Sequence, residues 1–318
     1  MQLLTKTFAL SLVILISLCL SGCGTNSRAT SGQGTVVEMQ EFQDIKAEAD
    51  KGDADAQNDL GVCYKNGEGV IKDDKEAVKW YRLAADQGNA DAQCNLGFCY
   101  KKGEGVKMDF EEAVKWYRLA VEQGLARAQS NLGVCYKNGE GVKKDFEEAV
   151  KWFRLAADQG HADAQYNLGV CYDNGEGVNK DVKEAVKWFR LAADQGQALA
   201  QHNMGVSYQN GEGVKKDNKE AVKWYRLAAD QEYAPAQSNL GGCYLNGEGV
   251  KKDNKEAVKW YRLAADQGIA VAQYNMGSCY ENGWGVPKNI PEAIKWYRKA
   301  ADQGDADAAI AVSELQGR

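Results

Sequence analysis

The chain has 318 residues, 44% of them hydrophobic and 26% charged, a composition typical of a globular protein and not of a disordered one. Its formal net charge of −6 provides no basic surface of the kind that nucleic-acid binding requires, so we expect no nucleic-acid partner. The chain contains 34 glycines but three prolines, and the glycines recur at fixed places. This pattern favours helices that end at glycine turns, and we expect an all-α protein.

Residues 1–22 have the pattern of a secretion signal. Lys6 supplies a basic start, and residues 7–20 form an apolar run that is short for a membrane span. The sequence Leu20-Ser21-Gly22-Cys23 resembles the lipobox of bacterial lipoproteins. That resemblance implies that Cys23 is lipidated and holds the chain to the membrane by its lipid alone. It also implies an extracytoplasmic location, in the outer membrane facing the periplasm or the cell surface, because the residue after Cys23 is Gly24 and not aspartate. We expect residues 23–36, rich in Gly, Ser and Thr, to be a flexible tether.

A tandem repeat of 36 residues follows. Seven tryptophans mark it without any insertion between copies: Trp80, Trp116, Trp152, Trp188, Trp224, Trp260 and Trp296. We number each copy from its first residue, so that Ala54 is position 1 of repeat 1 and seven repeats fill residues 54–305. Since one such unit cannot bury its apolar face alone, stacked neighbours must supply a continuous core.

Each repeat is predicted to form two helices. In the first half, Leu60, Gly61 and Tyr64 show three-and-four spacing, and this helix is expected to end at the glycine of Gly67. The second helix begins with Asp73 and Glu76, which fit a capping box in which each side chain bonds to the backbone at the other residue. Its apolar face carries the repeated tryptophan, which we assign to packing because aromatic residues at helical spacing are usually core residues.

Both ends of the array match half a repeat. Residues 37–53 resemble a second helix alone, and residues 306–318 resemble a first helix alone. Terminal half-repeats of this kind cover the exposed ends of a solenoid core. We therefore expect an N-terminal and a C-terminal cap helix.

The repeated residues resemble a known family, the Sel1-like repeat, which is related to the tetratricopeptide repeat. The resemblance rests on the string A-x-A-Q-x-N-L-G-x-x-Y-x-N-G-x-G-V, followed by the W-Y and A-A pairs of the second helix. It implies a right-handed α-solenoid of antiparallel helix pairs whose members act as adaptors for protein complexes. It also implies that the first helices line a concave groove, and it implies no shared catalytic residues.

The repeats differ from one another mainly on one face of the first helix. The most varied positions in repeat 1 are 55, 58, 62 and 65, whose spacing places them on one side of a helix. Drift on a wet surface would explain this variation, but the varied face also carries apolar and aromatic residues that solvation does not require. We predict partner-binding residues at Phe98, Arg127, Tyr166, Asp173, Leu199, His202, Leu245, Val271, Tyr274 and Glu281.

Nine cysteines raise the question of disulfides or a metal site. Cys19 would leave with the signal, and six others share position 10 of the repeat, where Ser207 replaces cysteine in repeat 5. Equivalent positions on stacked helices lie about 8–10 Å apart, beyond the roughly 7 Å Cα limit for a disulfide. We expect these cysteines to be small buried residues, although free thiols are unusual in an exported protein.

The sequence contains no recognisable catalytic site. No Ser-x-x-Lys string occurs, and neither His161 nor His202 has a nucleophile in a known pattern. We therefore expect no enzyme activity, no metal and no cofactor. The favoured hypothesis is a scaffold in the bacterial cell envelope that binds a protein or peptide along its concave face. The alternatives are a structural envelope protein, one that binds glycan or peptidoglycan fragments through Tyr166 and Tyr274, and, as the family resemblance allows, a β-lactamase-like enzyme.

Overall fold

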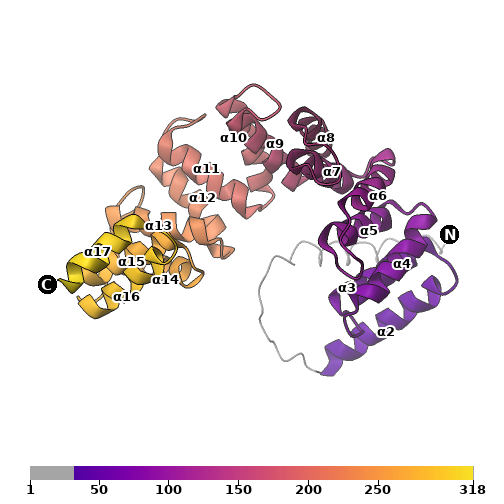
Figure 1. Cartoon of the computed structure of the whole chain (residues 1–318), viewed down its shortest axis with the longest axis horizontal. Helices are drawn as coiled ribbons and strands as arrows, with labels where there is room; N and C mark the ends of the chain where they lie inside the picture. The colour runs from indigo at the N-terminus through magenta and orange to yellow at the C-terminus, as the bar shows by residue number, and fades with distance from the viewer. Residues whose placement is uncertain (1–31, 318) are drawn as a thin grey trace, which may run out of the picture.

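The computed structural model describes residues 32–317 as a curved array of helix pairs (Figure 1). Residues 1–22 and Cys23, assigned above to a signal and a lipid anchor, lie outside the described residues. The helices follow one another along an arc, and each packs on the helices next to it in sequence. The predicted all-α solenoid with seven repeats is confirmed.

The first helices of the seven repeats are α3 (Ala54–Asn66), α5 (Ala90–Lys102), α7 (Ala126–Asn138), α9 (Ala162–Asn174), α11 (Ala198–Asn210), α13 (Ala234–Asn246) and α15 (Ala270–Asn282). The second helices are α4 (Asp74–Asp86), α6 (Phe110–Glu122), α8 (Phe146–Asp158), α10 (Val182–Asp194), α12 (Asn218–Asp230), α14 (Asn254–Asp266) and α16 (Ile290–Ala301). As predicted, a glycine ends each first helix. In α3 this is Gly67, in the left-handed conformation with φ 80°.

The second helices begin at a side-chain cap, but half of the predicted capping box is wrong. The Asp73 carboxylate accepts hydrogen bonds from the backbone N–H groups of Lys75 and Glu76, as expected. Glu76 does not reach back, because the Asp73 N–H already donates to the Tyr64 carbonyl at 2.9 Å. The Glu76 carboxylate pairs instead with Lys79. Both contacts recur in later repeats. The bond to the tyrosine carbonyl holds the loop that connects the two helices of each repeat.

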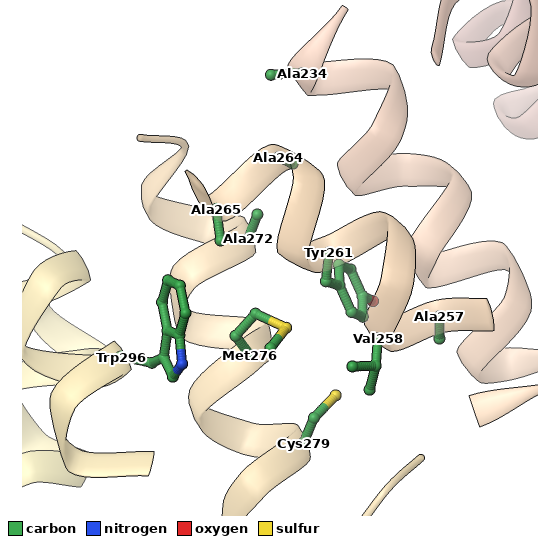
Figure 2. Packing of buried hydrophobic residues seen from close by; sticks show 10 residues of the cluster. All are labelled: Ala234, Ala257, Val258, Tyr261, Ala264, Ala265, Ala272, Met276, Cys279 and Trp296. Carbon is green, nitrogen blue, oxygen red and sulfur yellow. The ribbon is translucent and has the colours of Figure 1, made fainter. Parts of the chain in front are cut away.

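Each core cluster is shared between neighbouring repeats. Figure 2 shows one: Met276 and Cys279 of α15 lie between Trp296 of α16 and Tyr261 of α14. The tryptophan of every repeat packs in this way on a cluster formed by its own first helix and the preceding helix, which is the end helix α2 for repeat 1. The assignment of the tryptophans to packing is therefore confirmed, and the tryptophans join the repeats to one another.

A buried glutamine also joins each pair of repeats. The Gln57 amide donates to the Ala49 carbonyl at 3.2 Å, and its oxygen accepts from Gln87 at 2.7 Å. Equivalent bonds continue through the later repeats to Gln273 and Gln303. Since a buried polar group without a partner is costly, these paired amides fix how the repeats stack.

The two end helices, α2 (Gly32–Ala49) and α17 (Ala306–Gln316), pack on the first and last repeats. Phe42 and Ala49 of α2 are buried against α3, and Leu315 of α17 is buried against α16. Helix α2 begins at Gly32, so residues 32–36 of the expected tether are helical. The repeat pattern marks only the part of this helix that packs, and helix ends extend beyond their packed part without any such signal.

Candidate interaction face

The side chains at positions 2, 5, 9 and 12 of α3, α5, α7, α9, α11, α13 and α15 form what we call the first-helix face. Three predicted binding residues on it are exposed apolar side chains: Phe98 is 39% exposed, Leu199 39% and Val271 59%. Arg127 also lies on this face, where its guanidinium pairs with Asp91 at 3.0 Å. These four residues are accessible to a partner.

The predicted aromatic residues at position 5 are half-buried, because each leans on a second helix. Tyr166 lies 5.9 Å from Phe189 and Tyr274 lies 5.2 Å from Tyr297, measured between ring centroids. Burial raises the pKa of the Tyr166 hydroxyl. Each ring therefore packs on a second helix while the side chain stays partly exposed.

His202 lies between two tyrosine rings of its own repeat and an asparagine of the next repeat. Its imidazole is 5.8 Å from Tyr225 and 5.4 Å from Tyr233, and its Nε2 is 3.0 Å from the Asn239 amide nitrogen. Burial lowers the pKa of His202, so the ring is neutral at pH 7. A neutral, half-buried ring among tyrosines offers an amphipathic contact surface and has no neighbouring nucleophile to activate.

Sequence reasoning missed a row of asparagines at position 6. The Asn95 amide donates to Asn58 at 2.9 Å, and the Asn131 amide lies 3.6 Å from the Cys94 sulfur. Each bond connects position 6 of one repeat to position 5 of the repeat before. Asparagine occupies position 6 in six of the seven repeats, and that regularity was the available signal.

Position 12 contacts position 15 of the next repeat, which sequence reasoning also missed. Lys65 pairs with Glu104, and Lys101 pairs with Glu140 at 2.7 Å. Lys137 pairs with Glu176 at 3.7 Å, and in repeat 5 the Gln209 amide donates to Glu248 at 3.3 Å. These side chains at position 12 therefore bond to the next repeat.

The three predicted binding residues at position 12 have different surroundings. Leu245 packs against the core cluster of repeats 6 and 7, and Glu281 accepts a hydrogen bond from the Tyr297 hydroxyl at 2.8 Å. Asp173 lines a small cavity between repeats 4 and 5. Trp284, at position 15 of repeat 7, is exposed and replaces the glutamate of the other copies.

Seven cysteines lie in the described part of the chain, and all of them are buried and free, as predicted. Burial raises the pKa of Cys135 and of the five other cysteines at position 10 to about 11. These thiols stay protonated at neutral pH and are poor nucleophiles. Residues 32–317 contain no cluster of metal-ligating side chains and no helix long and apolar enough to span a membrane.

A family model described as Sel1 repeat matches seven consecutive segments: 54–89, 90–125, 126–161, 162–197, 198–233, 234–269 and 270–305. The chain belongs to the Sel1 repeat family. The seven matches coincide with the seven repeats read from the tryptophan spacing. Sel1 repeat proteins are generally scaffolds for protein interactions and are typically not catalytic.

Two solved structures of Sel1 repeat proteins are similar to this chain. A protective antigen of uropathogenic Escherichia coli with an SLR fold is 39% identical over 86% of this chain, with a TM-score of 0.76. This chain spans 59% of the length of that antigen. A Sel1 repeat protein from Oxalobacter formigenes is 35% identical, with a TM-score of 0.68, over 90% of this chain and 83% of that one.

The fold alone extends further. One chain of the APC/C hetero-tetramer Cut9–Hcn1 has a TM-score of 0.53 at 15% identity, covering 88% of this chain and 52% of that one. A search of curated proteins found no match to this chain.

Proposed function

We propose that the chain is a non-catalytic scaffold of the bacterial cell envelope that binds a protein or peptide along the first-helix face. The exposed apolar residues of that face carry the proposal: Phe98, Leu199 and Val271 make no contribution to a core, although the repeat keeps every packing position filled. Apolar side chains in a row of helices are the usual anchors of a peptide or protein partner. Cys23 would hold the scaffold to the membrane through its lipid.

The test is a pull-down from an envelope extract with the full chain and two triple variants. The first variant carries Phe98→Ser, Leu199→Ser and Val271→Ser. The matched control carries Leu83→Ser, Leu119→Ser and Leu155→Ser, which remove side chains of similar exposure, 49%, 41% and 48%, from the second helices. Equal helicity of all three proteins by circular dichroism shows that the fold is kept.

We expect one protein to be captured by the parent and by the control but lost with the first variant. Equal capture by all three proteins would show that the first-helix face is not the binding surface. Retention of the parent on purified cell wall, without a protein partner, would support the glycan-binding alternative instead.

The location is tested separately. Metabolic labelling with a fatty acid should mark the parent and place it in the membrane fraction, whereas Cys23→Ser should be unlabelled. A labelled Cys23→Ser variant, or an unlabelled parent, would contradict the lipid anchor.

A further inference from the structure

Position 12 of one repeat faces position 15 of the next, and at one junction, between repeats 4 and 5, both residues are acidic. In repeats 1–3 a lysine at position 12 pairs with the glutamate of the next repeat, and the side chain of Lys101 is only 15% exposed. In repeat 4 the lysine is replaced by Asp173, while the glutamate, Glu212, is kept. Neither carboxylate forms a salt bridge within residues 32–317. The junction of repeats 4 and 5 thus lacks the ammonium group that the three preceding junctions contain.

A cavity of about 80 Å³ lies at this junction. Asp173, Glu212 and Asn203 line it together with Ser207, which replaces the cysteine of the other repeats. Ser207 is 7% exposed, so its hydroxyl lies at the buried end of the cavity lining. Asp173 is half-buried, and Glu212 is exposed and accepts a hydrogen bond from the Asn210 amide at 3.3 Å. The cavity lining therefore carries two carboxylates and no ammonium or guanidinium group.

The loop of repeat 5 also stands further from the preceding repeat than its equivalents do. A β-carbon added to Gly213 would lie 2.6 Å from the Val182 carbonyl oxygen. At the equivalent glycines of repeats 2, 3, 4, 6 and 7 this distance is 2.0–2.2 Å. The junction in which two carboxylates replace the ion pair is the one with the wider spacing, whereas the junctions with Gln209 and Leu245 at position 12 keep the closer one.

An apolar surface lies beside the cavity. Tyr166 is on the same helix as Asp173, seven residues earlier, which corresponds to two turns or about 10 Å. On the neighbouring helix α11, His202 is half-buried and Leu199 is exposed. A ligand that reached the two carboxylates could therefore contact these apolar side chains as well.

We propose that the junction of repeats 4 and 5 binds the cationic side chain of a lysine or arginine in an extended peptide. An aromatic or aliphatic residue of the same peptide then packs on Tyr166, Leu199 and His202. Because an extended chain advances about 3.3 Å per residue, the two peptide residues are about three positions apart. The peptide's ammonium or guanidinium group takes the place that Lys137 occupies in the junction before. This inference rests on the proposed function and specifies the chemistry of the partner.

The experiment uses the full chain and an array of Gly-Ser peptides, each with one Phe and one Lys separated by one to six positions. A second array replaces each Lys by acetyl-lysine, which has the same stem but no charge. The test variant is Asp173→Lys, which restores the ion pair with Glu212. The matched control is Asp194→Lys, which makes the same change of charge at the exposed end of α10, the second helix of the same repeat.

We expect the tightest binding at a separation of three and a loss of at least about tenfold on acetylation, as for a charge-assisted hydrogen bond. Asp173→Lys should remove this preference for lysine, and Asp194→Lys should keep it. Thermal unfolding of Asp173→Lys at or above the parent temperature would show that the variant is folded. The isosteric Asp173→Asn should weaken binding in the same direction.

Three results would overturn the inference. Equal binding of lysine and acetyl-lysine peptides, with binding still lost when Leu199 and Val271 are changed to serine, would leave the proposed function standing and refute the cation site. Stabilisation of the parent by CaCl₂ but not of Asp173→Lys, without a preference for lysine, would assign the cavity to a metal ion. No binding of any peptide by the parent would contradict the inference together with peptide binding by the face.

Discussion

The first helices of repeats 1–3 and those of repeats 5–7 bury the same positions but expose different chemistry. Position 7 is a fully buried Leu or Met throughout, as in Leu96 and Met276. At position 2, by contrast, the charged residues of repeats 1–3 give way to three apolar ones. The early residues are Asp55, Asp91 and Arg127, and the later ones are Leu199, Pro235 and Val271. Copies that must stack on one another keep their packing residues, and they diverge where nothing within the array constrains them.

The largest expected effect tests the packing that both halves share. A β-carbon on Gly133 or Gly241 would lie 2.7 Å from the ring of the facing Phe153 or Tyr261, closer than atoms can approach. Gly133→Ala and Gly241→Ala should each lower the free energy of unfolding by roughly 1–3 kcal/mol, because the core must move. Urea unfolding followed by circular dichroism measures both.

The adjacent Gly242 provides the control. Its nearest neighbour would be the Tyr261 hydroxyl at 3.5 Å, an ordinary contact, so Gly242→Ala should not destabilise the helix. A clear difference between the Gly133 and Gly241 variants would show that the two halves do not share their packing.

A smaller effect should distinguish the ion-paired half from the other. Lys101→Met keeps the side-chain stem but leaves Glu140 without its cation, in a pair whose side chains are 15% and 25% exposed. We expect a loss of about 1–2 kcal/mol. Gln209→Met removes two hydrogen bonds that involve no cation, one to Glu248 at 3.3 Å and one from the Tyr225 hydroxyl at 2.6 Å. Its cost of about 1–2 kcal/mol should therefore change less with salt concentration than that of Lys101→Met.

The pH dependence of stability should show that the pair of Lys101 and Glu140 stabilises the fold. Burial alone would raise the pKa of Glu140, but hydrogen bonds from Lys101 and Asn138 and the charge of Lys101 outweigh it, so the pKa lies below 4.5. Since the unfolded chain binds the proton more readily, the stabilisation is present above pH 4.5 and is lost as the pH falls further. Equal midpoint shifts for Lys101→Met at pH 7 and at pH 3 would contradict this pair.

The smallest expected effect concerns His202 in the second half. Burial lowers its pKa below 6.5, so the unfolded chain takes up a proton first as the pH falls. The stability that depends on a neutral His202 is therefore present above pH 6.5 and decreases below it. Melting temperatures between pH 7.5 and 5.5 should fall less for His202→Asn than for the parent. Parallel curves would show that His202 titrates as it does in the unfolded chain.

The repeat boundaries, the packed tryptophans and the buried cysteines could be predicted because each depends on a regular spacing within one copy. The contacts of Lys65 with Glu104 and of Asn95 with Asn58 could not, because each joins two copies. Such pairs are 39 and 37 residues apart, and only the stacking register brings them together. For the same reason, Leu245 looked like a surface residue although it packs against the next repeat.

The exposure of the predicted binding face could be read from the sequence, whereas the contacts of its side chains could not. Exposure of Phe98, Leu199 and Val271 follows from their place on the solvent side of a helix, which periodicity reveals. The shift of Tyr166 and Tyr274 toward the core depends on rings of the second helix, and no pattern within the first helix encodes it. Whether these residues bind a partner stays a prediction.

Photo-cross-linking in living cells tests the central claim most directly. A photoreactive amino acid replaces Leu199 or Val271 on the first-helix face, and Leu83 or Leu119 on the second helices. We expect one protein to be linked at 199 and 271 and not at 83 or 119. Links that are equal at all four positions, or present only at 83 and 119, would contradict a scaffold that binds through its first-helix face.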